Sequence, residues 1–200
     1  ELIDVMNFEL VAPRYQHAGE YVITANVKNT NFNVDIIEGK LTVQKVEHNL
    51  GSGSPDFVNG ANIVYGSALS PLQFSNLDNR GRWTLKDSSI KALTPTTFTA
   101  TAVFTPKESR DYLVSEREVK LNVSKKTLTF NILENEFTYN SLNHFIEYEV
   151  DGIEEQDSSI IIVGNNVYRN AGTYDITLTV DQTDSRYVGS IKTTLIINKA

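Results

Sequence analysis

The sequence predicts an all-β chain of tandem small β-sandwiches without a significant helix. Several stretches alternate apolar and polar side chains at every second position, which is the pattern of a half-buried strand. Thr, Val, Ile, Tyr and Phe are plentiful, whereas Met and Trp occur once each, and this composition favours strands. Turn signals recur roughly every 8 to 12 residues, a spacing typical of sandwiches. The best helix candidate, residues 151–156, is a short acidic turn without an apolar stripe.

One strand pattern occurs three times. In its clearest copy, Tyr174 begins a strand whose apolar residues stand at every second position as far as Val180. The aromatic residues that begin the three copies, Tyr21, Phe98 and Tyr174, are 77 and 76 residues apart. A fixed period of this length predicts an array of one domain type. We therefore divide the chain into a first repeat, which is the C-terminal half of a truncated unit (residues 1–46), a complete middle repeat (47–125) and a complete third repeat (126–200).

Further equivalent positions align the ends of the three repeats. We interpret them as structural positions that pack the sheets, with no chemical role. A second aromatic column holds Phe32, Tyr112 and Tyr187, a leucine column holds Leu41, Leu121 and Leu195, and two later columns hold Val43, Val123 and Ile197, then Lys45, Lys125 and Lys199.

The same alternation places the individual strands. In the first repeat we expect strands over residues 6–11, 21–27, 32–37 and 40–45, with a tight turn at Glu38-Gly39 before the last of them. In the middle repeat we expect them over 62–66, 69–77, 82–85, 98–104, 112–114 and 119–123. In the third repeat we expect them over 127–133, 137–141, 145–150, 160–163, 174–180 and 193–198.

These strands carry a family resemblance. The run Ala171-Gly172-Thr173-Tyr174, with Tyr187 and the ending Leu195-Ile196-Ile197-Asn198-Lys199-Ala200, resembles the C-terminal half of the MBG-type repeats of bacterial surface proteins. Val64-Tyr65-Gly66-Ser67-Ala68-Leu69-Ser70, Gly81-Arg82-Trp83 and Val103-Phe104-Thr105-Pro106 with Asp111-Tyr112 resemble a sister bacterial Ig-like repeat. The resemblance covers nearly the whole chain and implies an extracellular or cell-surface bacterial protein whose units serve as stalk or adhesive modules. It brings no functional residues with it.

The middle repeat departs from this pattern at one turn. Thr96-Thr97 stand where the other repeats have Gly19-Glu20 and Gly172-Thr173. Because a β-branched residue tolerates positive φ poorly, we expect a different turn conformation there.

Composition excludes several classes of partner. The chain has no cysteine, so it offers no disulfide, thiolate metal site or cysteine nucleophile. Its formal net charge of −7 argues against nucleic acid and against an anionic membrane. No apolar run approaches the roughly 20 residues that span a bilayer. We expect a monomer without membrane insertion in this segment, with any export signal or wall anchor outside it and any contact with host or cell-wall glycans or glycoproteins made through other domains.

No catalytic constellation is found. His17, His48 and His144 fall at unrelated positions of the repeats, which makes a shared triad or zinc site improbable and favours surface or turn histidines. Trp83 could stack on a sugar if exposed, but we expect it in the core. We predict no enzyme, no cofactor and no metal. The acidic residues Asp151, Glu154, Glu155, Asp157, Asp181 and Asp184 could in principle bind calcium weakly, but solvated turns are the interpretation we favour.

The fold and the joints suggest a function. We expect sandwiches that are immunoglobulin-like in outline, with a β-grasp-like sheet as the structural alternative. Lys125 ends one repeat and Thr127 begins the next strand, so almost no free linker remains and the array should be a semi-rigid rod. We predict a structural or adhesive stalk segment of a bacterial cell-surface protein. A carbohydrate- or glycoprotein-binding module and an accessory domain of a secreted enzyme are the alternatives, and an isopeptide bond stays open.

Overall fold

The structure is a computed structural model in which strands are joined by turns and irregular segments. Its described residues contain no α-helix, which confirms the predicted all-β class and disfavours the β-grasp alternative. They group into two compact units, which we describe separately. The structure describes residues 8–11, 14, 16–31, 33–51, 55–75, 78–157 and 159–200. Unit 1 takes the described residues within Glu1–Pro55, Phe74–Leu85 and Ala102–Arg117, and unit 2 those within Asp56–Gln73, Lys86–Thr101 and Glu118–Ala200.

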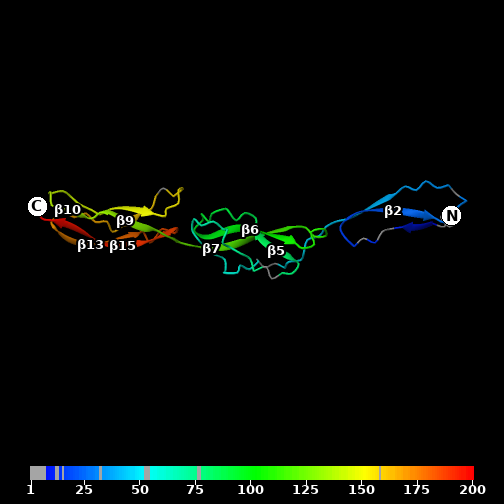
Figure 1. The fold of residues 1–200 in the computed structure, drawn as a ribbon, viewed down its shortest axis with the longest axis horizontal. Helices are drawn as coiled ribbons and strands as arrows, with labels where there is room; N and C mark the ends of the chain where they lie inside the picture. Colours follow the sequence, from blue (N-terminus) through cyan, green and yellow to red (C-terminus); the bar gives the residue numbers. More distant parts are fainter. Residues whose placement is uncertain are drawn as a thin grey trace. The chain divides into compact units, whose positions relative to one another are not determined.

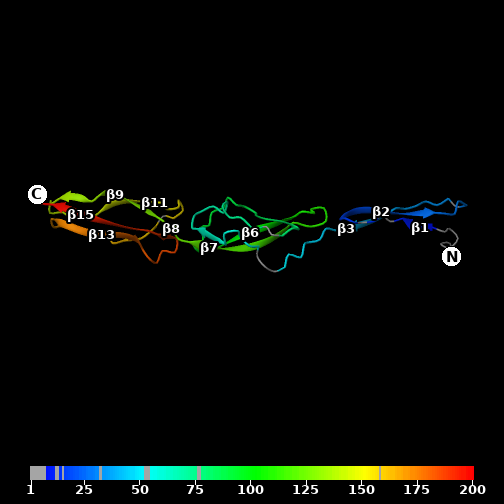
Figure 2. The ribbon, with the colours of Figure 1, turned by 60° about the horizontal axis from the view of Figure 1, so that its bottom comes forward.

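A three-stranded antiparallel sheet forms the first part of unit 1. Its strands are β1 (Phe8–Val11), β2 (Gly19–Val27) and β3 (Gly39–Val43), in the order β1-β2-β3, and Figure 2 labels all three. In the register between β2 and β3, Tyr21 lies opposite Leu41. Both side chains are half-buried.

The strand predicted over residues 32–37 is wrong where it can be assessed. Phe32 lies outside the described residues, and residues 33–38 form no strand. Val34, Ile36 and Ile37 are 38%, 44% and 93% exposed, so their alternation with polar residues buries no face. Because no apolar face is buried, forming a strand here would gain no hydrophobic free energy to offset the loss of backbone conformational entropy.

A four-stranded sheet contains β4 (Asn62–Val64), β5 (Gly81–Leu85), β6 (Thr96–Pro106) and β7 (Ser115–Ser124), in the order β4-β7-β6-β5. Within unit 1, β5 pairs antiparallel with β6, and Trp83 lies opposite Phe104. Their rings are 5.2 Å apart and 8% and 0% exposed, so the prediction that Trp83 belongs to the core is confirmed. Within unit 2, β4 pairs with β7 in parallel.

The strand predicted over residues 69–77 is also wrong. Residues 76 and 77 lie outside the described residues, and the rest form turns and isolated bridges. Leu69 is fully buried, but it reaches the core from a turn that the Leu72 N–H closes onto the Leu69 carbonyl at 2.9 Å. Pro71 lies inside this turn and has no N–H to give to a ladder, which explains why the apolar run does not extend as a strand.

The last 75 residues of the chain belong entirely to unit 2. Figures 1 and 2 show the β9–β11 pair and the β13–β15 pair as two layers. Phe130 of β9 meets the chain of the other layer at Gly189, where an added Cβ would lie 3.2 Å from its ring. The strands are β8 (Lys126–Thr127), β9 (Thr129–Glu134), β10 (Glu136–Thr138), β11 (Glu147–Asp151), β12 (Ile162–Val163), β13 (Gly172–Val180), β14 (Tyr187–Val188) and β15 (Ser190–Asn198), paired as β10-β15-β13-β12, β11-β9 and β14-β8.

The strand registers repeat between the parts of the chain. Tyr174 lies opposite Leu195 in β13 and β15, as Tyr21 lies opposite Leu41. The leading strands β4 and β10 both pair in parallel with the strand that ends their repeat, with Ile63 opposite Val123 and Phe137 opposite Ile197. The three-repeat division stays a prediction.

The turn at Thr96 has an uncommon backbone conformation. Thr96 adopts φ +69°, a left-handed value that its branched side chain disfavours. Gly172, at the equivalent position, is absent from the residues with positive φ. The turn that begins β6 therefore differs from the one that begins β13, but the reason given for the prediction is wrong, because Thr96 and not Gly172 adopts the positive φ.

Candidate functional site

The segment that links the middle repeat to the third repeat lies within unit 2 and pairs through its backbone with β14. We call residues 124–128 the 124–128 joint. The Lys126 N–H donates to the Arg186 carbonyl at 2.8 Å, and the Leu128 N–H donates to the Val188 carbonyl at 2.8 Å. These bonds make β8 and β14 a short parallel ladder with Lys126 opposite Tyr187. The chain therefore leaves one repeat and pairs with the next within two residues.

A carboxylate beside this joint binds residues from both sides of it. The hydroxyl of Tyr65, from the middle repeat, and that of Tyr187, from the third, donate to Oδ2 of Asp157 at 2.9 and 2.5 Å. Nη1 of Arg186 donates to its Oδ1 at 2.9 Å. The two tyrosine rings meet edge to face with centroids 5.5 Å apart. We call these four residues, with the Glu154 pairs described next, the Asp157 cluster.

Glu154 adds a second carboxylate to the cluster. Its side chain is 8% exposed and accepts from Nζ of Lys126 at 2.5 Å and from Nζ of Lys91 at 2.7 Å. Its backbone N–H donates to the Tyr187 hydroxyl at 2.9 Å. The carboxyl group packs against Gly66, where an added Cβ would overlap with Oε1. Glycine at position 66 is thus required by both the close approach and its φ of +78°.

The contacts in the cluster lower the pKa values of its two carboxyl groups and raise those of its two tyrosines. Burial alone would raise the pKa of Asp157, but the hydrogen bonds from Tyr187 and Tyr65 and the charge of Arg186 outweigh it and hold the pKa below its usual range. The hydrogen bonds from Lys126 and Lys91 lower the pKa of Glu154. Burial and the hydrogen bond to Asp157 raise the pKa of both tyrosines. The cluster therefore keeps anionic carboxylates and neutral phenols over a wide pH range.

The arrangement binds the chain to itself rather than activating a group for reaction. Arg186 is shared between Asp157 and Asp184, which it contacts at 2.9 Å. Each carboxylate therefore already accepts several donors. The part of the chain that the structure describes holds no group of three or more His, Cys, Asp or Glu residues that could bind a metal ion.

The joint between the first and middle repeats, residues 44–48, lies within unit 1 and also pairs in parallel through its backbone with the following repeat. Val46 forms a parallel bridge with Tyr112, and the Val46 N–H donates to the Asp111 carbonyl at 3.1 Å. The ring of His48 stacks on that of Tyr112 with centroids 3.6 Å apart. We call residues 44–48 the 44–48 joint. The side chain of Asp111, whose carbonyl binds Val46, accepts a hydrogen bond from His17 Nδ1 at 2.7 Å, and this bond lowers the pKa of Asp111.

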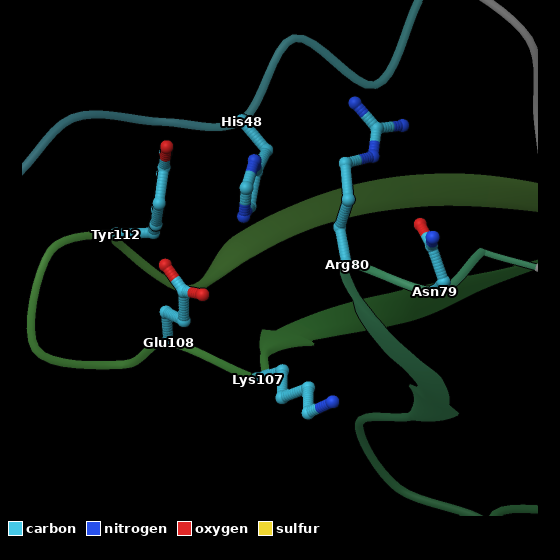
Figure 3. Close-up of a pocket in the computed structure, with 6 residues that line it drawn as sticks. All are labelled: His48, Asn79, Arg80, Lys107, Glu108 and Tyr112. Atoms are coloured by element: carbon cyan, nitrogen blue, oxygen red, sulfur yellow. The ribbon is translucent and has the colours of Figure 1, made fainter.

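A polar pocket of about 400 Å³ adjoins the 44–48 joint within unit 1. Figure 3 shows the Glu108 carboxylate near the rings of His48 and Tyr112, with Arg80 and Lys107 farther along the same hollow. Arg80 donates to both oxygens of Asp78, and this pairing lowers the pKa of Asp78 to about 2. The pocket is lined by His48, Asn79, Arg80, Lys107, Glu108 and Tyr112.

The predicted structural positions are distributed between the sheets and the joints. Tyr21 and Tyr174 each donate their hydroxyl to the backbone carbonyl four residues earlier, at 2.7 and 2.9 Å, and Phe98 cannot. All three are half-buried. Tyr112 and Tyr187 are brought to the two joints, and Phe32 lies outside the described residues. Leu121 and Leu195 are fully buried, whereas Leu41 is half-buried.

Two predictions about polar residues need correction. His144 is only 9% exposed, because its ring stacks on Phe137 at 4.5 Å, so it is not a surface histidine. Glu154 and Asp157 do not lie in a solvated turn, since the cluster encloses them. From the sequence, both carboxylates were grouped with other acidic residues as a possible weak calcium site, and their binding of tyrosine, lysine and arginine side chains was not predicted.

Comparisons with known proteins add little to this picture. No family model matches the chain, and no curated protein is similar to it. A three-Ig structure of titin domains I67–I69 covers 97% of this chain and 82% of its own length at 12% identity, with a TM-score of 0.29. A protocadherin γB4 extracellular domain covers 96% at 12% identity with a TM-score of 0.22, and this chain spans 41% of its length. At these scores neither likeness carries an argument, and the all-β class rests on the strand pairing.

No helix long and apolar enough to cross a bilayer occurs in the described part of the chain.

Proposed function

We propose that the chain is a structural or adhesive stalk segment of a bacterial cell-surface protein, in which tandem β repeats form a semi-rigid rod. The observation that supports this most is the Asp157 cluster, because it ties Tyr65 and Lys91 of the middle repeat to residues of the third. A flexible connection would need none of these contacts. An extracellular location is supported by the resemblance to MBG-type repeats, and the absence of cysteine is compatible with it.

A stalk function requires joints that resist bending. Each joint combines backbone pairing with side-chain contacts, so bending would break several hydrogen bonds together. The formal net charge of −7 adds self-repulsion, which keeps such a segment soluble and disfavours self-association.

Small-angle scattering of the purified 200-residue chain tests the proposal. A rod gives an elongated particle with a single, salt-independent maximum dimension. A compact particle, or a dimension that varies as expected for freely jointed domains, would contradict it.

A second candidate, a glycan-binding module, is favoured by the pocket beside the 44–48 joint. The side chains of Lys107 and Glu108 have no ion-pair partner among the described residues, and His48 adds a ring nitrogen, whereas Arg80 is already paired with Asp78. Such a mixture suits a sugar that carries a carboxylate. Saturation-transfer NMR with glucuronic acid and, for comparison, with glucose tests this candidate. If neither sugar receives saturation from the protein, the candidate is excluded. The variant Lys107→Ala should weaken glucuronic acid selectively.

A further inference from the structure

The segment that leads into β4 contains an asparagine followed by a glycine in an exposed turn. We call residues 57–60 the 57–60 turn, which the Gly60 N–H closes onto the Phe57 carbonyl at 3.3 Å. Asn59 and Gly60 are both exposed, and Gly60 adopts φ +74°. The dipeptide Asn-Gly occurs at this one place in the sequence.

An asparagine side chain can react with the backbone that follows it. The backbone nitrogen of the next residue attacks Cγ and closes a succinimide ring. Glycine favours this reaction, because it has no Cβ to obstruct its nitrogen and its backbone reaches the conformations that the ring requires. The attack is intramolecular, so its rate depends on how freely the two groups can meet.

Little in the 57–60 turn keeps the two reacting groups of Asn59 and Gly60 apart. Among the described residues, none forms a hydrogen bond with the Asn59 side chain. The bond from the Gly60 N–H is longer than the usual N–H···O distance of about 2.7 to 3.2 Å, so the nitrogen loses little when it leaves the Phe57 carbonyl. The Val58 N–H is held more firmly, by the Gln73 carbonyl at 2.8 Å. The turn is therefore anchored before Asn59 and open at the reacting groups.

A similar dipeptide, Asp151-Gly152, is held differently. Asp151 lies in β11 opposite Thr129, and its Oδ2 accepts from Nδ2 of Asn131 at 2.5 Å. Strand pairing and this hydrogen bond restrict both its backbone and its side chain. A carboxylate is also a poorer electrophile than an amide, because its negative charge repels the attacking nitrogen. The exposed turn is thus the more reactive of the two places.

We propose that Asn59 is a site of spontaneous deamidation. The Gly60 nitrogen forms a bond to Cγ of Asn59, the bond from Cγ to Nδ2 breaks, and the proton of the Gly60 N–H leaves with Nδ2 as ammonia. Water then opens the succinimide at one of its two carbonyls. Opening at one carbonyl gives aspartate, and opening at the other gives isoaspartate, in which the backbone runs through Cβ and Cγ. Water is the only co-reactant, and no group is oxidised or reduced.

The isoaspartate product changes the backbone close to β4. It adds a methylene group to the main chain before Gly60. The Ala61 carbonyl, which follows, accepts from the Asn122 N–H at 2.6 Å and begins the ladder between β4 and β7. Displacing this carbonyl weakens the bond, so the modification loosens the attachment of β4 to the strand that ends the middle repeat.

Peptide mapping by mass spectrometry tests the proposal on the full 200-residue chain. During incubation at pH 8, Asn59 should deamidate at a rate within about tenfold of that in a free peptide of residues 56–63. It should react at least about tenfold faster than Asn79, an exposed turn asparagine that is followed by Arg80. A rate more than about tenfold below that of the peptide, or no faster than that of Asn79, would overturn the proposal.

The effect on β4 is measured on the isolated products. In the isoaspartate form, separated by chromatography, the Asn122 amide should exchange at least about fivefold faster than in the unmodified chain. Freshly purified Asn59→Asp is the matched control, because it carries the same new charge on an unaltered backbone, and exchange at Asn122 should stay unchanged. Unchanged exchange in the isoaspartate form, or an equal acceleration in Asn59→Asp, would refute an effect through the backbone.

Discussion

The two joints share a backbone design and differ in their side chains. In the 44–48 joint Val46 bridges Tyr112, and in the 124–128 joint Lys126 bridges Tyr187, both in parallel. Lys45 and Lys125 stand at equivalent sequence positions. The Nζ of Lys45 donates to the Ser109 carbonyl at 2.6 Å, and that of Lys125 donates to the Gln182 carbonyl at 3.3 Å. The repeat pattern therefore specifies how the backbone passes from one repeat to the next.

The difference lies in how deeply the polar contacts are buried. The His17–Asp111 pair of the 44–48 joint is 45% and 20% exposed, whereas the Asp157–Arg186 pair of the 124–128 joint is 10% and 25% exposed. Exposed pairs contribute little because water and salt screen them, whereas removing one partner of an enclosed pair leaves a charge or hydroxyl unsatisfied. Side chains, not backbone pairing, are expected to set the stiffness of each joint.

The largest effect is expected from Asp157→Ala. Two enclosed tyrosine hydroxyls and one bond of Arg186 lose their acceptor, so the free energy of unfolding should fall by about 3 kcal/mol. Urea titration followed by amide exchange in β13 and β15 measures it. Glu155→Ala is the matched control, since this neighbouring acidic residue is exposed, and it should change stability by less than about 0.5 kcal/mol. Equal effects of the two variants would contradict the role of the cluster.

Gly66→Ala should have the next largest effect. The new Cβ would collide with the Glu154 carboxyl group and the residue would be strained at φ +78°, for a total cost of about 2 kcal/mol. Gly60→Ala provides the control, because Gly60 has a similar φ of +74° but an added Cβ there meets only Asn62 Nδ2 at 3.1 Å. A difference between the two variants in urea titration isolates the contact with Glu154. Identical losses would show that only backbone strain matters.

Acid should loosen the 124–128 joint more than the 44–48 joint. The pKa values of Asp157, Glu154 and Asp184 are all lowered in the folded chain, so their contribution is complete above the usual carboxyl pKa and is lost as pH falls through the lowered values. The 44–48 joint holds one such group, Asp111. Amide exchange at Lys126 and Val46, compared between pH 7 and pH 2.5 after correction for intrinsic rates, should show the greater acid loss at Lys126. The opposite order would break the comparison.

The smallest effect is expected from His17→Ala. The pair with Asp111 is partly exposed, and the backbone bonds of Val46 remain in place without it. The urea midpoint should shift less than it does for Asp157→Ala. A shift as large as that of Asp157→Ala would mean that the exposed pair holds its joint as strongly as the enclosed one.

The strands that face a sheet partner could be predicted from the sequence. The segments beginning at Tyr21, Phe98 and Tyr174 carry apolar residues at every second position and lie in β2, β6 and β13. The same reasoning failed at residues 33–38, whose alternation buries nothing, and at Leu69, which is buried from a turn. The alternation of apolar and polar residues does not show whether a second layer covers the apolar face of a segment.

The cluster at the 124–128 joint was beyond sequence reasoning for a different reason. Tyr187 was recognised as a repeat position, but Asp157 lies 30 residues from it and Tyr65 lies 92 residues from Asp157. Only the fold brings these three residues together. The sequence has 25 acidic residues, so it could not show which of them accepts from the Tyr187 hydroxyl. Gly66 carried a local signal, because a glycine in a turn can mark a close approach or a positive φ, but it could not name Glu154 as the residue that it meets.

The central claim is that the Asp157 cluster fixes the 124–128 joint, and a distance measurement across it is the most direct test. Because the chain has no cysteine, Lys120→Cys and Glu149→Cys place spin labels on exposed positions of β7 and β11 only. Pulsed electron resonance should give one narrow distance distribution, which broadens when Asp157→Ala is added and stays narrow with Glu155→Ala. A distribution already broad with Asp157 in place would contradict the account.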